Sequence, residues 1–177
     1  MDNKLYIIWG SHGHIMRTQL TDDGLHLIKN FKVDRAAGLP CIPRRVYEGA
    51  YAYYRNGYWY LFAAKGNYTS ATDPYEVIVG RSKKLNGTFR NKWGLPLKWG
   101  CYTKILTPND CSKYLGGAHT GEIFTDKDGR TFIFYARQKA EVMHYRLLCL
   151  QEIFWDKKGW PYFKDSKTQL EGECPNL

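Results

Sequence analysis

Residues 46–64 read Val-Tyr-Glu-Gly-Ala-Tyr-Ala-Tyr-Tyr-Arg-Asn-Gly-Tyr-Trp-Tyr-Leu-Phe-Ala-Ala, two aromatic runs on either side of Asn56-Gly57. Both turn residues tolerate the positive φ angles of a type I′ turn, and aromatic runs of this kind are typical of β-strands. The stretch therefore predicts a β-hairpin. Glu48 stands at the entrance to its first strand, and Gly49 allows the backbone to turn there without steric cost.

Glu48 is a lone carboxylate beside an extensive aromatic surface, and two interpretations are open. It is either a structural carboxylate satisfied by its neighbours or a general acid that donates a proton to a substrate.

The hairpin pattern returns along the chain, which decides the fold class. The tight turns at Gly57 and Gly129 are 72 residues apart, and turns before short outer strands fall at Gly24, Gly87 and Gly159, at intervals of 63 and 72 residues. Four-stranded units repeated in this way are typical of β-propeller blades. We predict an all-β chain of about three four-stranded antiparallel blades, with a β-sandwich as the alternative.

The boundaries of these units follow from the same pattern. In the first unit we expect strands at 4–9, 14–20 and 25–28. We expect a connector at 30–47, where Gly38, Pro40 and Pro43 discourage a helix, and an outer strand of the second unit at Thr88-Phe89. Residues 91–118 are predicted to be loop. We assign residues 1–165 to a partial propeller domain and 166–177 to a polar C-terminal tail.

The composition limits the possible partners. The 177 residues carry a net charge of +9, but Lys and Arg are scattered through turns and form no long basic run, so we expect no nucleic-acid partner. No apolar stretch approaches the ~20 residues of a membrane helix. Aromatic residues make up 16% of the chain, which suits β-sheets and sugar-binding clefts. We expect no membrane partner, and the localisation stays open.

The five cysteines, Cys41, Cys101, Cys111, Cys149 and Cys174, lack metal-ligand spacing. They are interpreted as isolated thiols, with a Cys101–Cys111 disulfide left open.

Several ordered motifs resemble glycoside hydrolase family 43, whose members are five-bladed β-propeller arabinanases, α-L-arabinofuranosidases and β-xylosidases. The stretches that carry the resemblance are 5–11, Glu48-Gly49-Ala50-Tyr51 with Arg55 to Phe62 and Val79 to Ser82, Gly117-Ala118-His119 with 123–126, and 146–161. The likeness covers residues 3 to about 163. It implies that the chain is the C-terminal three-blade portion of a five-bladed propeller.

The resemblance also implies an inverting mechanism, in which an acid protonates the leaving oxygen and a base carboxylate activates water. Glu48 matches the acid. The family's base and the aspartate that tunes the acid lie upstream of the element matching residues 5–11, so we expect both to be missing and this chain alone to be nearly inert.

Further site residues are expected from the same resemblance. Arg146 would bind substrate hydroxyls or the acid, or else form an ordinary ion pair. Trp9 and His12 occupy the segment that lines the family's sugar pocket, although Trp9 at a strand end also suits a core. His119 resembles a histidine near a central metal ion, so calcium is an open alternative to a site without cofactors. Ala136 departs from the Tyr-His that the family often has at 135–136.

The sequence thus leaves several alternatives open. The leading interpretation is a glycosidase of the arabinan- and xylan-degrading type, which would act on oligo- or polysaccharides of arabinose or xylose. The rival is a catalytically inactive carbohydrate-binding or vestigial propeller fragment. Three blades do not close a ring, so we expect either missing upstream blades or a homo-oligomer.

Overall fold

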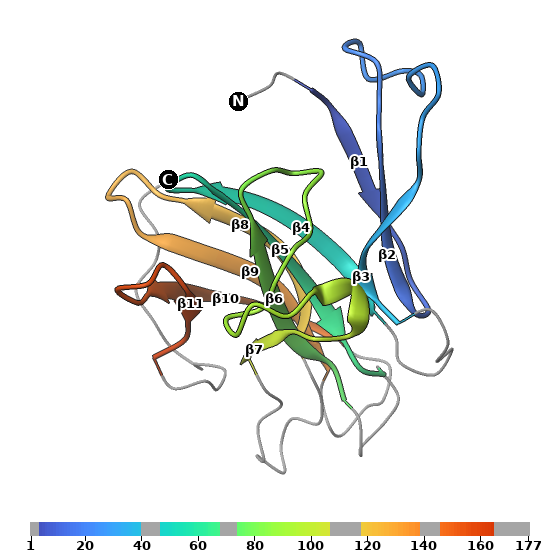
Figure 1. Ribbon diagram of the computed structural model, residues 1–177. Coiled ribbons are helices and arrows are strands. Elements are labelled where there is room, and N and C mark those ends of the chain that lie inside the picture. The colour runs from blue at the N-terminus through green and yellow to red at the C-terminus, as the bar shows by residue number, and fades with distance from the viewer. Residues whose placement is uncertain (1–3, 40–46, 68–73, 107–117, 139–145, 165–177) are drawn as a thin grey trace.

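The structure is a computed structural model that describes residues 4–39, 47–67, 74–106, 118–138 and 146–164. Its strands form three antiparallel sheets that follow one another along the chain, coloured blue, teal to yellow-green, and orange to red in Figure 1. The prediction of an all-β chain built from antiparallel sheets is confirmed. The expected tail at 166–177 lies outside the described residues, so the division into domains stays a prediction.

The strand order within each sheet is simple. The first sheet contains, in order, β1 (Tyr6–Trp9), β2 (His14–Gln19) and β3 (Asp34–Gly38). The second contains β4 (Tyr47–Arg55), β5 (Tyr58–Lys65), β6 (Glu76–Ser82) and β7 (Thr103–Leu106), with a short 3-10 turn η1 (Leu97–Trp99) before β7. The third contains β8 (Ala118–Thr125), β9 (Thr131–Gln138), β10 (Arg146–Trp155) and β11 (Pro161–Tyr162).

The first sheet differs from the prediction of four-stranded blades. Its third strand is β3, inside the predicted connector 30–47, whereas the expected strand 25–28 makes only an isolated bridge between Leu27 and Leu20. Ala36 and Ala37 in β3 are buried, and small alanines give little strand signal. Asp34 pairs with the buried Arg17 of β2, which fixes the strand in place.

The second sheet also corrects one boundary. Thr88-Phe89 does not form the outer strand; Arg90 next to it makes isolated bridges to Arg81 and Pro96. The outer strand is β7, in the stretch predicted to be loop, where Thr103 and Ile105 are buried and Lys104 is exposed. Lys104 pairs with Glu76 of β6, so an ion pair joins the two strands. The outer strand of the third sheet, β11, falls at the predicted position.

The second sheet is buried on both faces, because neighbouring residues of a strand point to opposite sides. Tyr60 and Phe62 of β5 belong to a hydrophobic cluster shared with Ile133 and Tyr135 of the third sheet. Leu61 and Ala63 belong to a second cluster, which includes Ile15 and the two alanines of the first sheet. Each sheet therefore stacks on the next, in the order of the chain.

The first sheet leaves part of its apolar surface uncovered. Leu5, just before β1, and Ile7 and Trp9 within it occupy alternate positions, with 45%, 44% and 40% of their surface exposed. Association of this face with a second copy or with further blades stays a prediction. No helix of the described residues is long and apolar enough to cross a membrane. Cys101 is a free thiol, as expected, and Cys111 lies outside the described residues.

Candidate active site

Glu48 lies at a break in the regular pairing of β4. The register between β4 and β5 shifts between Glu48 and Tyr51, and Gly49 inside the shift has a φ of 61°, a conformation that favours glycine. Bulges of this kind bend a strand and re-aim a side chain, and they are over-represented next to active sites. The expected turn at Gly49 is confirmed, and it sets the direction of the Glu48 carboxylate.

A serine from the first sheet contacts this carboxylate. Ser11 Oγ donates a hydrogen bond to Glu48 Oε2 at 2.6 Å. A serine hydroxyl can donate to a carboxylate or accept from a protonated carboxyl, so the contact suits both protonation states. The sequence indicates a turn at Gly10-Ser11-His12-Gly13 but assigns Ser11 no role. No local pattern connects Ser11 with Glu48, which lies 37 residues away.

The turn that presents Ser11 requires its glycine. Gly10 has a φ of 144°, and a Cβ there would lie 2.0 Å from the backbone oxygen of His14. His12 is exposed and adopts a positive φ of 54°. Because Trp9 and His12 flank Ser11 closely in sequence, the turn brings two of the expected substrate-binding residues to the same end of the fold as Glu48.

The strands β4 and β8 lie beside each other and run in the same sense. Tyr53 and Thr125, near the ends of the two strands, share a hydrogen bond between their hydroxyls. Glu122 of β8 interacts electrostatically with Tyr51 of β4, in agreement with this alignment. The two strands therefore begin at the same end of the molecule, where Glu48 lies.

The alignment places the backbone of His119 at that end, because it is the second residue of β8. The side chain of His119 lies outside the described part of the structure. The strand repeats the bulge of β4, with a register shift between Thr120 and Ile123 around Gly121. A Cβ at Gly121 would lie 2.1 Å from the backbone oxygen of Phe134, so close packing requires this glycine.

Arg146 is the first residue of β10, and its side chain is exposed. It pairs in register with Gln138, at the end of β9 next to the start of β8. Arg146 thus lies at the same end of the third sheet as His119, but β9 separates the two strands. Its role in substrate binding stays a prediction.

The titration of Tyr51 reflects this environment. Burial raises the pKa of the Tyr51 phenol above its usual value of 10.0, and the negative charge of Glu122 acts in the same direction. The phenol therefore stays neutral at physiological pH, where it is available as a hydrogen-bond donor on β4.

A metal centre needs several ligand side chains close together. Within the described ranges, no group of three or more His, Cys, Asp and Glu side chains lies close enough to hold a metal ion. Several acidic residues there are used structurally. Asp126 and Asp156 accept backbone hydrogen bonds in their own turns, and Asp34 and Glu76 form ion pairs.

Comparison with known proteins gives a consistent picture. Residues 1–161 match the family described as glycosyl hydrolases family 43. The chain is 26% identical over 115 residues to an extracellular exo-alpha-(1->5)-L-arabinofuranosidase from Cellvibrio japonicus, covering 64% of this chain and 32% of that protein. It is 23% identical over 197 residues to an extracellular endo-alpha-(1->5)-L-arabinanase from Bacillus subtilis, covering 90% and 39%.

Solved structures show the same fold. The α-L-arabinanase of Cellvibrio cellulosa, in a structure complexed with arabinohexaose, superposes with a TM-score of 0.80 at 22% identity. The match covers 92% of this chain and 53% of the other. The three stacked sheets are therefore propeller blades, as predicted, and the chain spans about half the length of this structure and less of its curated relatives.

Proposed function

The chain belongs to glycosyl hydrolases family 43, and from this premise we propose that it carries the proton-donating half of a site that cleaves arabinan-type glycosidic bonds, with Glu48 as the general acid. The placement of Glu48 carries the proposal. Its carboxylate lies at a glycine bulge at the start of β4, and a hydroxyl from the neighbouring sheet holds it. A general acid needs such fixed placement within reach of the leaving oxygen.

We propose that Trp9, His12 and Arg146 bind the sugar and that His119 lies near a calcium ion if one is bound. The alignment of β4 and β8 and the turn at Ser11 support this, because they bring these positions to the end where Glu48 lies. The curated relatives and the complexed arabinanase point to an arabinose-containing chain as the ligand.

Inverting hydrolysis also needs a base, and we propose that this chain does not provide one. Glu122 on β8 is the strongest rival among the described carboxylates, because it lies near Tyr51, three residues from Glu48 along β4. Where two carboxylates act as a unit, an enzyme that lacks one of them loses most of its catalytic rate. We therefore expect the chain alone to bind arabino-oligosaccharides but hydrolyse them very slowly.

A small anion can replace the missing base, which gives a direct test. Azide can attack the anomeric carbon from the open face; the glycosidic bond breaks, and the leaving oxygen takes the proton of Glu48. We expect arabinohexaose to be cleaved at a measurable rate only when azide is added, with a glycosyl azide as the product. The variant Glu48→Gln should lower this rate by a factor of about 10²–10⁴, the usual contribution of a general acid. The matched variant Glu122→Gln should leave it unchanged.

Three results would contradict the proposal. Hydrolysis without azide that is lost in Glu122→Gln would place the base in this chain. An azide reaction of equal rate in Glu48→Gln would remove Glu48 as the acid. Binding of arabinohexaose with no reaction even in azide would favour the second candidate, a non-catalytic carbohydrate-binding propeller. The exposed indole of Trp9 next to Ser11 is the observation that favours this candidate.

A further inference from the structure

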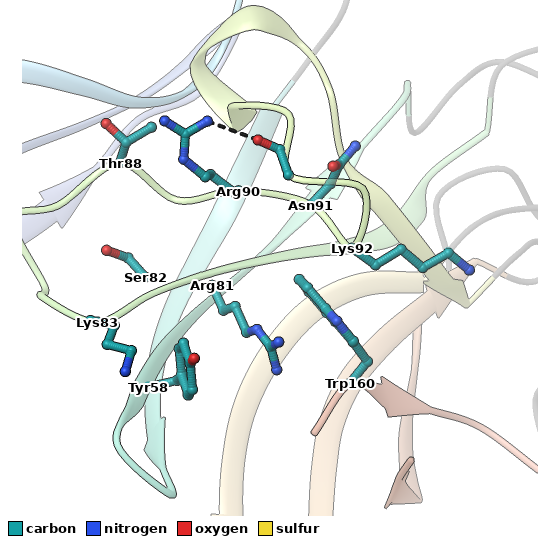
Figure 2. Close-up of a pocket in the computed structure, with 10 residues that line it drawn as sticks. Tyr58, Arg81, Ser82, Lys83, Thr88, Arg90, Asn91, Lys92 and Trp160 are labelled. Atoms are coloured by element: carbon teal, nitrogen blue, oxygen red, sulfur yellow. Dashed lines mark hydrogen bonds between the residues drawn. The ribbon is translucent and has the colours of Figure 1, made fainter. Parts of the chain in front are cut away.

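A basic hollow lies between the second and third sheets, away from Glu48. It has a volume of about 420 Å³, which falls in the range of small-ligand sites, ~300–1,000 Å³. Four cationic side chains and two aromatic rings line it: Arg81, Lys83, Arg90, Lys92, Tyr58 and Trp160. They come from the end of β6, from the segment after it, from the start of β5 and from the residue before β11. Figure 2 shows Arg81 extending between Tyr58 and Trp160, with Arg90 and Lys92 at the rim.

The strand registers place this hollow at the opposite end of the second sheet from Glu48. The strand β4 runs from Glu48 to Arg55, which pairs with Tyr58, and Ser82 pairs with Trp59 beside it. At ~3.3 Å per residue, the seven steps from Glu48 to Arg55 separate the two ends by roughly 20 Å. A ligand in the hollow would therefore not occupy the active site.

Arg81 provides a fixed positive charge in the wall. Its guanidinium lies 4.3 Å from the ring centre of Trp160 and 4.5 Å from that of Tyr58. Arg81 Nη1 also donates to the backbone oxygens of Lys158 at 2.7 Å and Gly159 at 3.3 Å. Stacking and hydrogen bonds to neutral groups hold the guanidinium in place without cancelling its charge.

The other three cations also lack carboxylate partners among the described residues. Lys83 lies over the ring of Tyr58 and Lys92 over that of Trp93, while Arg90 donates to the backbone oxygen of Gly94 at 2.8 Å. Among the described residues that line the hollow, none is acidic. Four like charges around one cavity repel one another, and a bound anion would relieve that repulsion.

We propose that this hollow binds the carboxylates of an acidic carbohydrate, a sugar chain that contains uronate residues. The cationic wall provides the affinity for carboxylate, and guanidinium pairs with it well. The compact volume fits a short sugar segment rather than the extended groove that a nucleic-acid strand needs. Lys83 and Arg81 also make cation–π contacts with the ring of Tyr58, so this ring is not available to stack on a nucleic-acid base. The proposal rests on the family membership, since one similar protein is an endo-arabinanase, but it does not rest on Glu48.

Calorimetric titration of the 177-residue chain with trigalacturonate at low salt tests the proposal, with neutral arabinotriose as the uncharged comparison. We expect saturable binding of the acidic sugar that weakens as salt is added. The exposed pair Arg90→Gln and Lys92→Gln should weaken it about tenfold, because two of the four positive charges around the hollow are removed. Lys29→Gln, an exposed lysine in the first sheet's loop, is the matched control and should change nothing.

Other outcomes would overturn it. The proposal would be wrong if trigalacturonate did not bind or if arabinotriose bound equally well. It would also be wrong if the double variant kept the full affinity for trigalacturonate. Stronger binding of a DNA oligonucleotide or of inorganic phosphate, lost in the double variant, would assign the hollow to a different anion. Glu48→Gln should bind trigalacturonate normally, so the two proposals can fail independently.

Discussion

The second sheet meets its two neighbours in different ways. Toward the third sheet it presents large aromatic side chains, and Tyr60, Phe62 and Tyr135 are all buried there. Toward the first sheet, the small residues Ala36, Ala37 and Ala63 pack together with larger side chains such as Leu61 and Ile15, and the buried cation Arg17 adds polar contacts. The apolar surface removed from water per residue is smaller with alanine, so the first interface depends more on polar contacts.

This difference matters for the active site. Glu48 belongs to the second sheet, but the hydroxyl that contacts it comes from the first. Glu48, the proposed acid, is therefore anchored on the well-packed pair of sheets, whereas Ser11, Trp9 and His12 are on the sheet with the thinner interface. We expect the side of the site with the proposed sugar-binding residues to open locally more easily than the side that carries Glu48.

Two adjacent residues of β5 test this comparison most strongly. Phe62 and Leu61 are both fully buried but point to opposite interfaces. Phe62→Ala should cost about 3–5 kcal/mol of unfolding free energy and Leu61→Ala about 2–5 kcal/mol, because each leaves a cavity. Denaturant unfolding gives the costs. Hydrogen exchange should show Leu61→Ala exposing mainly the first sheet and Phe62→Ala exposing the second and third together.

The exposed residue Ile7 is the control for this pair. Ile7→Ala should change the unfolding free energy by less than about 0.5 kcal/mol, as surface substitutions usually do. Identical exchange patterns in Phe62→Ala and Leu61→Ala would mean that the two interfaces open as one unit, and the comparison would be wrong.

Arg17 tests the polar part of the thinner interface. Its guanidinium pairs with Asp34 of β3, and its Nη1 also donates to the backbone oxygens of Leu85 and Gly87, which follow β6. Arg17→Met should cost about 2–3 kcal/mol, less than the usual loss from a fully buried pair, because Asp34 is half exposed and water can solvate it. Thermal unfolding gives the cost.

Asp34→Asn is the matched control for this prediction. It keeps the two carbonyl contacts of Arg17 and removes only the charge of the half-exposed partner, so it should cost about 1 kcal/mol or less. If both variants cost the same, the contacts to Leu85 and Gly87 contribute nothing, and Arg17 does not join the two sheets.

The parts of this fold that the sequence predicts are those set by local chemistry. Asn56 and Gly57 have φ angles of 48° and 80°, as the expected type I′ turn requires. The strands β3 and β7 escaped prediction, because small or mixed side chains next to glycine and proline carry little strand signal although distant partners bury them. Tertiary context overrides weak propensity at such positions.

The functional features divide in the same way. Gly49 could be predicted to turn the backbone beside Glu48, because the dipeptide itself carries that information. The contact from Ser11 could not, because it depends on how two sheets stack. The basic hollow was also missed, since it combines residues from 58 to 160 that no local pattern connects.

Tyr60 gives the smallest and most specific test, because its hydroxyl connects the two well-packed sheets. It donates to the backbone oxygen of Gly159, beside the basic hollow. Tyr60→Phe should cost about 1 kcal/mol at neutral pH, the usual net value of one hydrogen bond. Denaturant unfolding at neutral pH checks this, and Tyr162→Phe on an exposed tyrosine is the control.

The pH dependence of the same variant sharpens the test. Burial raises the pKa of Tyr60 above 10.0, with the neighbouring Arg81 opposing that shift. The folded state therefore holds this proton more tightly than the unfolded state does. The contribution of the Tyr60 phenol to stability is complete below pH 10. It is lost as the pH rises from 10 through the pKa of Tyr60 in the folded state. The wild-type chain should lose more stability above pH 10 than Tyr60→Phe does. Parallel stability curves for the two proteins in that range would show that the phenol is not protected at this interface.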